Sequence, residues 1–159
     1  MSSTPVLGLS VQSGNENWLY PYGYEKQASS KNSNEILQLA NEVARIMRNV
    51  AEVPFNSVKS GAYKTASGTS LDWYKGALGA RYAFTSDLRG KSFNPSKRYI
   101  VEPRLIKGSG EEFLAGMKVV FENLIQDVKK GWIKPECRKN IWNDKTCKKE
   151  DRRGKCRFK

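Results

Sequence analysis

The stretch from Ala66 to Arg89, ASGTSLDWYKGALGARYAFTSDLR, decides the fold. A Gly-Thr-Ser turn near its start predicts a short helical segment over residues 71–80. From Tyr82 onward, aromatic and apolar side chains alternate with small or polar ones, which is typical of a β-strand. Asp87 and Arg89 stand two residues apart at the polar end of this strand, so the alternation predicts that both lie on the same side. A carboxylate in such a place is a candidate site residue, although it is more often an ordinary surface charge.

The flanking residues predict strands that alternate with helices. The predicted elements are a strand over residues 5–11, an extended or turning segment over 18–24, an amphipathic helix over 33–50 ended by Pro54, a polar loop over 55–65, and a second helix opened by a capping box at Ser109–Glu112 and ended by Gly131. Alternation of this kind predicts an α/β fold, with helical layers around a mainly parallel sheet.

The composition excludes several classes of site and of protein. The chain contains no histidine, which removes the commonest metal ligand and the commonest general base. No apolar run approaches the roughly eighteen residues of a membrane helix, and no signal peptide is visible after Met1. Three cysteines, Cys137, Cys147 and Cys156, all lie in the last quarter, so the body of the chain has no disulfide framework.

The net charge of +12 is concentrated near the C-terminus. Lys129–Lys159 carries 13 Lys and Arg against 4 Asp and Glu, a net charge of +9. Such a segment binds polyanions, or it is simply solvated charge, and the sequence leaves both interpretations open. The change in composition predicts two parts, a main domain over residues 1–130 and a basic, Cys-containing tail over residues 131–159.

Three motifs together resemble the zinc carboxypeptidases of the pancreatic A/B type. Ala-Ser-Gly-x-Ser-x-Asp-Trp begins at Ala66, Tyr-x-Phe-Thr-x-acid-Leu-Arg begins at Tyr82, and Tyr-Pro-Tyr-Gly-Tyr occupies Tyr20–Tyr24 at about the family distance upstream. The resemblance runs from about Pro5 to Val128 and covers only the second half of a family catalytic domain. It implies part of a three-layer α/β domain with a mainly parallel or mixed sheet.

The resemblance also implies a chemistry that this chain lacks in part. In the family, a zinc ion held by His, Glu and a second His activates water, which hydrolyses the C-terminal peptide bond of peptides or proteins. The position of the second His is Gln12, and an amide oxygen is a poor, neutral zinc ligand. The other zinc ligands belong to the half of the family domain that this chain does not match. We therefore expect no metal ligands and no zinc cofactor in this chain.

Three further positions carry family roles by resemblance, and two more are expected to be structural. Asp87 stands where the family has its Glu general base, and the side chain is shorter by one methylene, about 1.5 Å. The Tyr that covers the substrate aligns with Lys64, or with Tyr63 after a slip of one residue, and we prefer Tyr63 because it retains the hydroxyl. Leu71 takes the pocket position and suggests an apolar preference, although plain packing explains it equally well. Asp72 and Trp73 are interpreted as structural, a helix-start carboxylate and a core anchor.

These observations favour a non-catalytic, truncated or degenerate carboxypeptidase relative, whose exposed sheet edge a second chain would complete. The alternative is a secreted interaction protein that binds a polyanion or a protein partner through Lys129–Lys159. The family is extracellular, although no signal peptide is visible here. The segment Cys147–Cys156 resembles the middle of a ShK-type module, with a Glu where that module usually has Trp, and a disordered basic tail is the competing interpretation.

Overall fold

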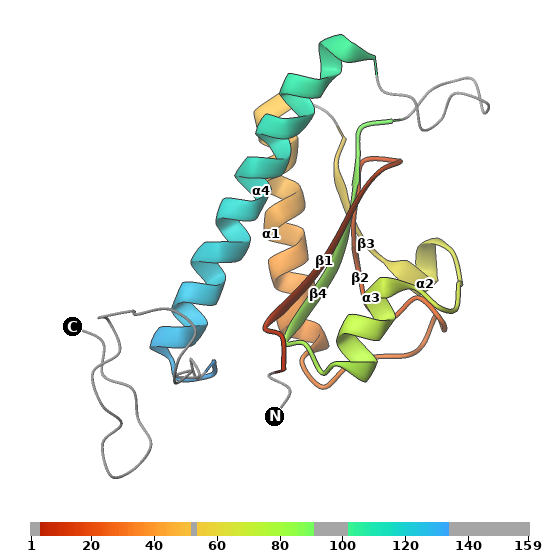
Figure 1. The fold of residues 1–159 in the computed structure, drawn as a ribbon, viewed down its shortest axis with the longest axis vertical. Helices are drawn as coiled ribbons and strands as arrows, with labels where there is room; N and C mark the ends of the chain where they lie inside the picture. Colours follow the sequence, from red (N-terminus) through yellow and green to blue (C-terminus); the bar gives the residue numbers. More distant parts are fainter. Residues whose placement is uncertain (1–3, 52–53, 91–101, 134–159) are drawn as a thin grey trace, which may run out of the picture. The chain divides into compact units, whose positions relative to one another are not determined.

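The structure, a computed structural model, describes residues 4–51, 54–90 and 102–133 of the chain (Figure 1). Its elements are β1 (Leu7–Ser13), β2 (Asn17–Tyr20), α1 (Ser33–Ala51), β3 (Asn56–Lys59), α2 (Ser60–Tyr63), α3 (Ser70–Asp72), the π-helical turn η1 (Trp73–Ala77), β4 (Tyr82–Leu88) and α4 (Pro103–Lys129). The predicted α/β class is confirmed. Residues 134–159, which make up most of the predicted Cys-containing tail, lie outside the described residues.

The four strands form one mixed sheet in the order β1-β4-β2-β3. β1 pairs with β4 in parallel, β2 pairs with β3 in parallel, and β2 pairs with β4 in antiparallel orientation. β4 is an interior strand, and all six residues from Tyr82 to Asp87 are buried. A strand covered on both faces is uniformly buried whatever its sequence alternation, which explains why polar residues of β4 are buried as well.

One face of the sheet packs against α1 and contains most of the large core side chains. The ring centroids of Trp18 and Phe84 lie 5.3 Å apart, and the rings of Phe84 and Tyr82 stack. α1 contacts β2 and β3. Most positions of its predicted apolar face are buried, namely Ile36, Leu39, Ala40, Val43 and Met47, whereas Val50 near the end of the helix is exposed. This apolar face stabilises the fold mainly through the surface that it removes from water.

The opposite face packs against α3 and η1. A Cβ on Gly8 would lie 2.2 Å from Cγ of Tyr74, so glycine is required where η1 crosses β1. Leu19, Leu71 and Ala83 form a small buried cluster here, with Val58 and Tyr74 packed against it. The helical segment predicted over residues 71–80 is shorter in the structure, where it ends at Ala77, and its second part, η1, is a π-helical turn.

Two predictions about the elements were wrong. Residues 55–65 are not only a loop, because they contain β3 and α2. The sequence of β3 has no strand periodicity of its own, and these residues form a strand because they pair with β2. Ser109 and Glu112 do not open a helix, because α4 begins six residues earlier at Pro103, a residue well suited to a first helical turn. Glu112 instead pairs with Arg89.

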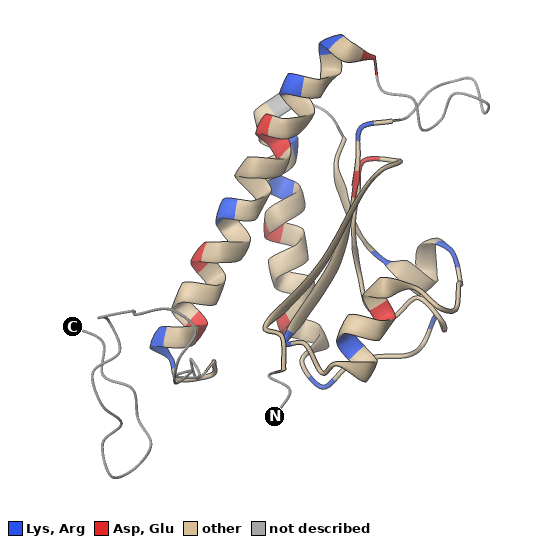
Figure 2. Cartoon of the chain, in the orientation of Figure 1, with Lys and Arg blue, Asp and Glu red and all other residues tan. Residues whose placement is uncertain are grey.

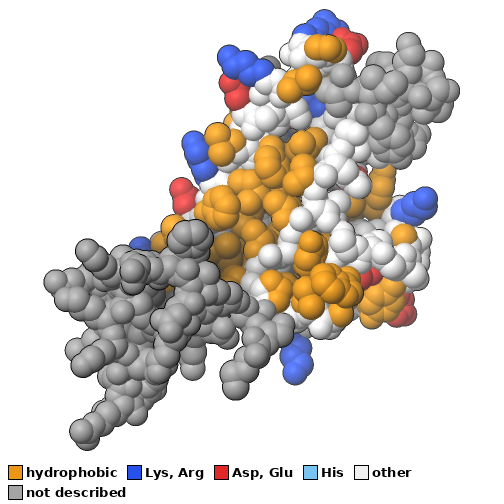
Figure 3. Space-filling view, viewed as in Figure 1, with side chains coloured by type: hydrophobic (Ala, Val, Ile, Leu, Met, Phe, Trp, Pro, Cys, Tyr) orange, Lys and Arg blue, Asp and Glu red, His pale blue; other side chains and the backbone are white. Residues whose placement is uncertain are grey.

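The backbone contacts divide the chain into Met1–Asn123 and Leu124–Lys159. Within the first unit, α4 meets α1 at Gly116, where a Cβ would lie 2.8 Å from Sδ of Met47. Charged residues are concentrated on the helices and loops, and the strands are largely uncharged (Figure 2). Hydrophobic side chains remain at the surface between α4 and β1 (Figure 3).

The described part of the second unit is the end of α4 and the turn after it. Gly131 has a φ of 74°, and the N–H of Trp132 donates to the carbonyl of Asp127 at 2.9 Å. This arrangement is a glycine-type helix end, so the prediction that Gly131 ends the helix is confirmed.

Candidate functional site

Gln12 and Asp87 lie side by side near the ends of β1 and β4. They are register partners in the parallel ladder, and Nε2 of Gln12 donates a hydrogen bond to Oδ1 of Asp87 at 2.6 Å. The Asp87 residue is 4% exposed, whereas Gln12 is exposed. The two positions that the resemblance assigned to a metal ligand and a general base therefore bond directly to each other.

The Asp87 carboxyl group lies in a confined environment. Burial raises its pKa above the usual value, and the hydrogen bond from Gln12 opposes that shift in part. A Cβ on Gly14 would lie 2.7 Å from Cβ of Asp87, so glycine at this position leaves room for the acid. The Asp87 carboxylate thus contacts the Gln12 amide, which donates to it, and the Gly14 backbone lies close to the same side chain.

Tyr63 reaches the same end of the sheet from α2. Its hydroxyl accepts a hydrogen bond from Nδ2 of Asn15 at 2.8 Å, and Asn15 lies two residues beyond the end of β1. Lys64, the other candidate, directly follows α2, and its backbone N–H donates to the carbonyl of Ser60. Sequence reasoning did not identify Asn15, because a polar loop residue carries no signal until its partner is known.

Leu71 lies in the buried cluster with Leu19 and Ala83, and it is 2% exposed. The packing interpretation fully accounts for this position. Its assignment to a substrate pocket stays a prediction.

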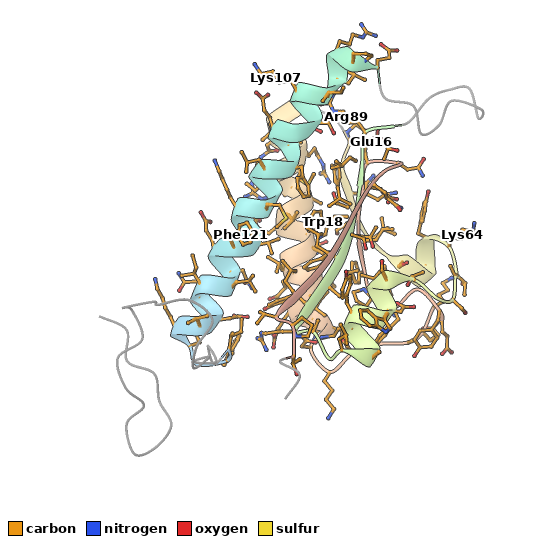
Figure 4. The ribbon with its side chains drawn as sticks, in the orientation of Figure 1. Glu16, Trp18, Lys64, Arg89, Lys107 and Phe121 are labelled. Atoms are coloured by element: carbon orange, nitrogen blue, oxygen red, sulfur yellow. The ribbon has the colours of Figure 1, made fainter. Side chains whose placement is uncertain are left out.

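Arg89 and Asp87 do not form a common site. β4 ends at Leu88, so the strand alternation no longer governs Arg89, and its Nε donates to both carboxylate oxygens of Glu112 at 2.9 Å. Glu112 is almost completely buried, and Glu16 lies near Arg89 at the same end of the sheet (Figure 4). Pairing with Glu112, opposed in part by burial, raises the pKa of Arg89, and Glu16 adds to the rise. The expectation that Asp87 and Arg89 face the same way was wrong.

Asp72 anchors the loop that follows β2. Its two carboxylate oxygens accept hydrogen bonds from the backbone N–H groups of Gly23 and Tyr24, at 2.8 and 2.9 Å.

Trp73 is 54% exposed, so the prediction that it anchors the core was wrong, and fully buried Trp18 has that role. An open hollow of about 590 Å³ is lined by Tyr24, Gly68, Thr69, Ser70, Asp72 and Trp73. None of Gln12, Tyr63, Leu71 and Asp87 lines it.

The side chains at the ends of β1 and β4 do not fit a zinc ion. The lone pair on Nε2 of the Gln12 amide is delocalised into the carbonyl, and this nitrogen donates a hydrogen bond to Asp87. The amide oxygen of Gln12 is a poor, neutral zinc ligand. Zinc sites in proteins use Cys, His and carboxylate ligands, usually four in number with water included. In residues 4–51, 54–90 and 102–133, no group of three or more such side chains could hold a metal ion.

Comparisons with known proteins agree on one family. The zinc carboxypeptidase family model matches residues 1–112. A metallocarboxypeptidase A-like protein of Trichophyton verrucosum is 28% identical over 109 residues, which are 67% of this chain and 25% of that protein. Bovine thrombin-activatable fibrinolysis inhibitor, solved in complex with tick carboxypeptidase inhibitor, superposes with a TM-score of 0.66 at 23% identity, over 75% of this chain and 39% of that one. Carboxypeptidase A of Helicoverpa armigera gives a TM-score of 0.62 at 22% identity, over 72% and 28% of the two chains.

The two solved structures support the fold, and the family model covers well over half of the chain. The chain spans only about a quarter of the length of the curated relative it matches. No helix among the described residues is long and apolar enough to cross a membrane. On these matches, the chain belongs to the zinc carboxypeptidase family.

Proposed function

We propose that this chain is a non-catalytic member of the zinc carboxypeptidase family. The observation that carries the proposal is the hydrogen bond of 2.6 Å from Nε2 of Gln12 to Oδ1 of Asp87. In the family reaction, a carboxylate at the Asp87 position accepts a proton from zinc-bound water. In this chain the same carboxylate is buried and accepts a hydrogen bond from the Gln12 amide.

The side-chain length at Asp87 supports the same conclusion. An Asp in place of Glu withdraws the carboxylate by about 1.5 Å. A displacement of about 1 Å at a reacting group costs on the order of a hundredfold in rate. The Gln12 position adds to this loss, because an amide oxygen is a poor, neutral zinc ligand in place of an imidazole.

Tyr63 and Leu71 are the residues that we assign to the remaining peptide contacts. The Asn15–Tyr63 hydrogen bond holds the hydroxyl near the end of β1, which suits a side chain that covers a peptide C-terminus. Leu71 is buried with Leu19 and Ala83, and its role beside an apolar terminal side chain is assigned by resemblance. The proposal is therefore binding of peptide or protein C-termini without their hydrolysis.

The experiment is a hydrolysis assay on the full chain with chromogenic C-terminal peptides that end in Phe or Lys, with added zinc. We expect no release above the rate without protein, with or without a chelator, and the same result for Asp87→Asn. Chelator-sensitive release that Asp87→Asn abolishes would overturn the proposal.

A second candidate function has the basic segment as its support. We propose that an extracellular form of the protein binds polyanions through Lys129–Lys159, whose net charge is +9. Retention on heparin that declines steeply with salt, and that is lost on deletion of residues 134–159, supports this role. No retention at low salt removes it.

A further inference from the structure

The hollow beside α3 shares no lining residue with the site formed by Gln12 and Asp87. Its volume is about 590 Å³, which is within the usual range for sites that hold small molecules. The loop after β2, the turn before α3, α3 itself and the start of η1 contribute its lining. The lining residues all belong to the first unit of the chain: Tyr24, Gly68, Thr69, Ser70, Asp72 and Trp73.

Two large aromatic side chains line the hollow and remain open to solvent. Tyr24 is 48% exposed and Trp73 is 54% exposed. Each ring packs against one aromatic neighbour, Tyr24 against Tyr22 with centroids 5.4 Å apart and Trp73 against Tyr74 with centroids 5.6 Å apart. Each ring is therefore supported on one part of its surface and available to a ligand on the rest.

The two aliphatic hydroxyl groups that line the hollow are already engaged. Oγ1 of Thr69 accepts a hydrogen bond from the backbone N–H of Asp72 at 3.2 Å. Oγ of Ser70 shares a hydrogen bond of 2.6 Å with Oγ of Ser10. A neutral ligand rich in hydroxyl groups needs several free polar partners, because each unpaired polar group that it buries costs free energy. The lining therefore favours a ligand that does not depend on hydrogen bonds.

Asp72 supplies a negative charge to this lining. Its carboxylate accepts hydrogen bonds from the backbone N–H groups of Gly23 and Tyr24, and each oxygen retains a further lone pair. In the part of the chain that the structure describes, no Lys or Arg side chain forms an ion pair with it. Burial is the main cause that raises the pKa of Tyr22, and Tyr24 and Asp72 add to the rise, so the charge of Asp72 acts on the aromatic residues around it. A cationic ligand would balance this charge.

We propose that the hollow binds the quaternary ammonium group of a small soluble cation of the choline type. The methyl groups of the ligand lie against the rings of Tyr24 and Trp73, whose negative faces attract the cation, and Asp72 balances its charge. A quaternary ammonium group has no N–H donor, so it does not need the hydroxyl groups that are already engaged. A primary ammonium group is compact and strongly hydrated, and it fits an aromatic lining less well. This binding is independent of hydrolysis at the ends of β1 and β4.

The probe is choline, titrated into the full 159-residue chain and followed by NMR, with sodium chloride adjusted so that the ionic strength stays constant. We expect the indole signal of Trp73 to shift until it saturates, with a dissociation constant on the order of 1 mM. The neutral isostere of choline, in which a tert-butyl group replaces the trimethylammonium group, has the same shape and should bind about tenfold more weakly.

Trp73→Leu removes the ring but keeps an apolar side chain, and we expect the affinity for choline, followed at the backbone amide of Gly68, to fall by about tenfold. Trp132→Leu is the matched control, because Trp132 is equally exposed and does not line the hollow. It should leave the affinity unchanged. Asp72→Asn keeps one oxygen that accepts a backbone hydrogen bond and removes the charge, and it should also weaken binding by about tenfold.

Circular dichroism of the three variants checks that each retains the fold of the parent chain, and Trp73→Leu decides the question if Asp72→Asn does not fold. Equal binding of choline and its neutral isostere would overturn the proposal, because apolar contact alone would then explain the binding. An unchanged affinity in Trp73→Leu, or no saturable shift up to about 100 mM choline, would overturn it as well.

Discussion

The two halves of β4 differ in what they share with the zinc carboxypeptidases. In the first half, buried Phe84 packs against Trp18 and stacks on Tyr82, within a fold that superposes on solved relatives with TM-scores above 0.6. Asp87 in the second half accepts a hydrogen bond from Gln12, the residue that the resemblance assigns to the position of a family zinc ligand. Packing depends on shape and hydrophobicity and tolerates many sequences, whereas a metal site depends on a few donor atoms. A chain can therefore retain the scaffold and lose the chemistry.

The largest effect is expected in the packed half. Phe84→Ala removes a fully buried ring between Trp18 and Tyr82, and we expect it to lower the free energy of unfolding by about 3–5 kcal/mol. Phe121→Ala, at an exposed position on α4, is the matched control and should change it by no more than about 0.5 kcal/mol. Denaturant unfolding measures both, and equal losses would contradict the assignment of the core.

The next effect concerns the ion pair that joins the end of β4 to α4. Arg89→Met leaves the buried Glu112 carboxylate without its partner, and we expect a loss of about 3 kcal/mol. The exposed pair of Arg104 and Glu102 supplies the control, because Arg104→Met should cost no more than about 1 kcal/mol. If the two variants are equally stable, the Arg89–Glu112 pair does not hold the helix to the sheet.

A smaller effect is expected at the site itself. Gln12→Ala removes the donor to Asp87, and the free energy of unfolding should fall by about 1 kcal/mol, because an exposed partner is partly replaced by water. Gln38→Ala, at an exposed position on α1, is the control for the loss of an amide. A destabilisation as large as that of Phe84→Ala would show that the site is part of the core.

The smallest effect is a dependence on pH. Burial raises the pKa of Asp87 above its ordinary value of 3.8, so the folded chain binds a proton more tightly than the unfolded chain does. The contribution of Asp87 to stability is therefore fully present below pH 3.8 and declines as the pH rises through the raised pKa. The difference in stability between the parent chain and Asp87→Asn should follow this decline. A difference that grows in the opposite direction would contradict the cause given for the shift.

The helix α1 and the strand β4 could be predicted because each has a strong periodicity of its own. β3 could not, since its four residues become a strand only through pairing with β2. The start of α4 was misplaced because Glu112, which looks like a capping residue, pairs with Arg89. Local patterns do not reveal such tertiary partners.

The candidate site was predictable in its members but not in its geometry. Gln12 was identified by its distance from the Tyr20–Tyr24 motif, and Asp87 was identified as the acid within the motif that begins at Tyr82. Their hydrogen bond depends on the register between β1 and β4. That register could not be predicted, because the two residues are 75 positions apart in the sequence. Trp73 was misassigned because a large aromatic residue in a motif resembles a core residue, whereas the structure places it 54% exposed at the start of η1.

Zinc titration tests the central claim most directly, with the metal bound followed by calorimetry and the Asp87 carboxyl group followed by NMR. The protein used is the full chain with Cys137, Cys147 and Cys156 changed to Ser, so that thiols cannot bind the metal. We predict no stoichiometric binding and no change in the Asp87 signal. Binding of one zinc ion per chain that shifts the Asp87 signal, and that is lost in Gln12→Ala and Asp87→Asn, would contradict the account.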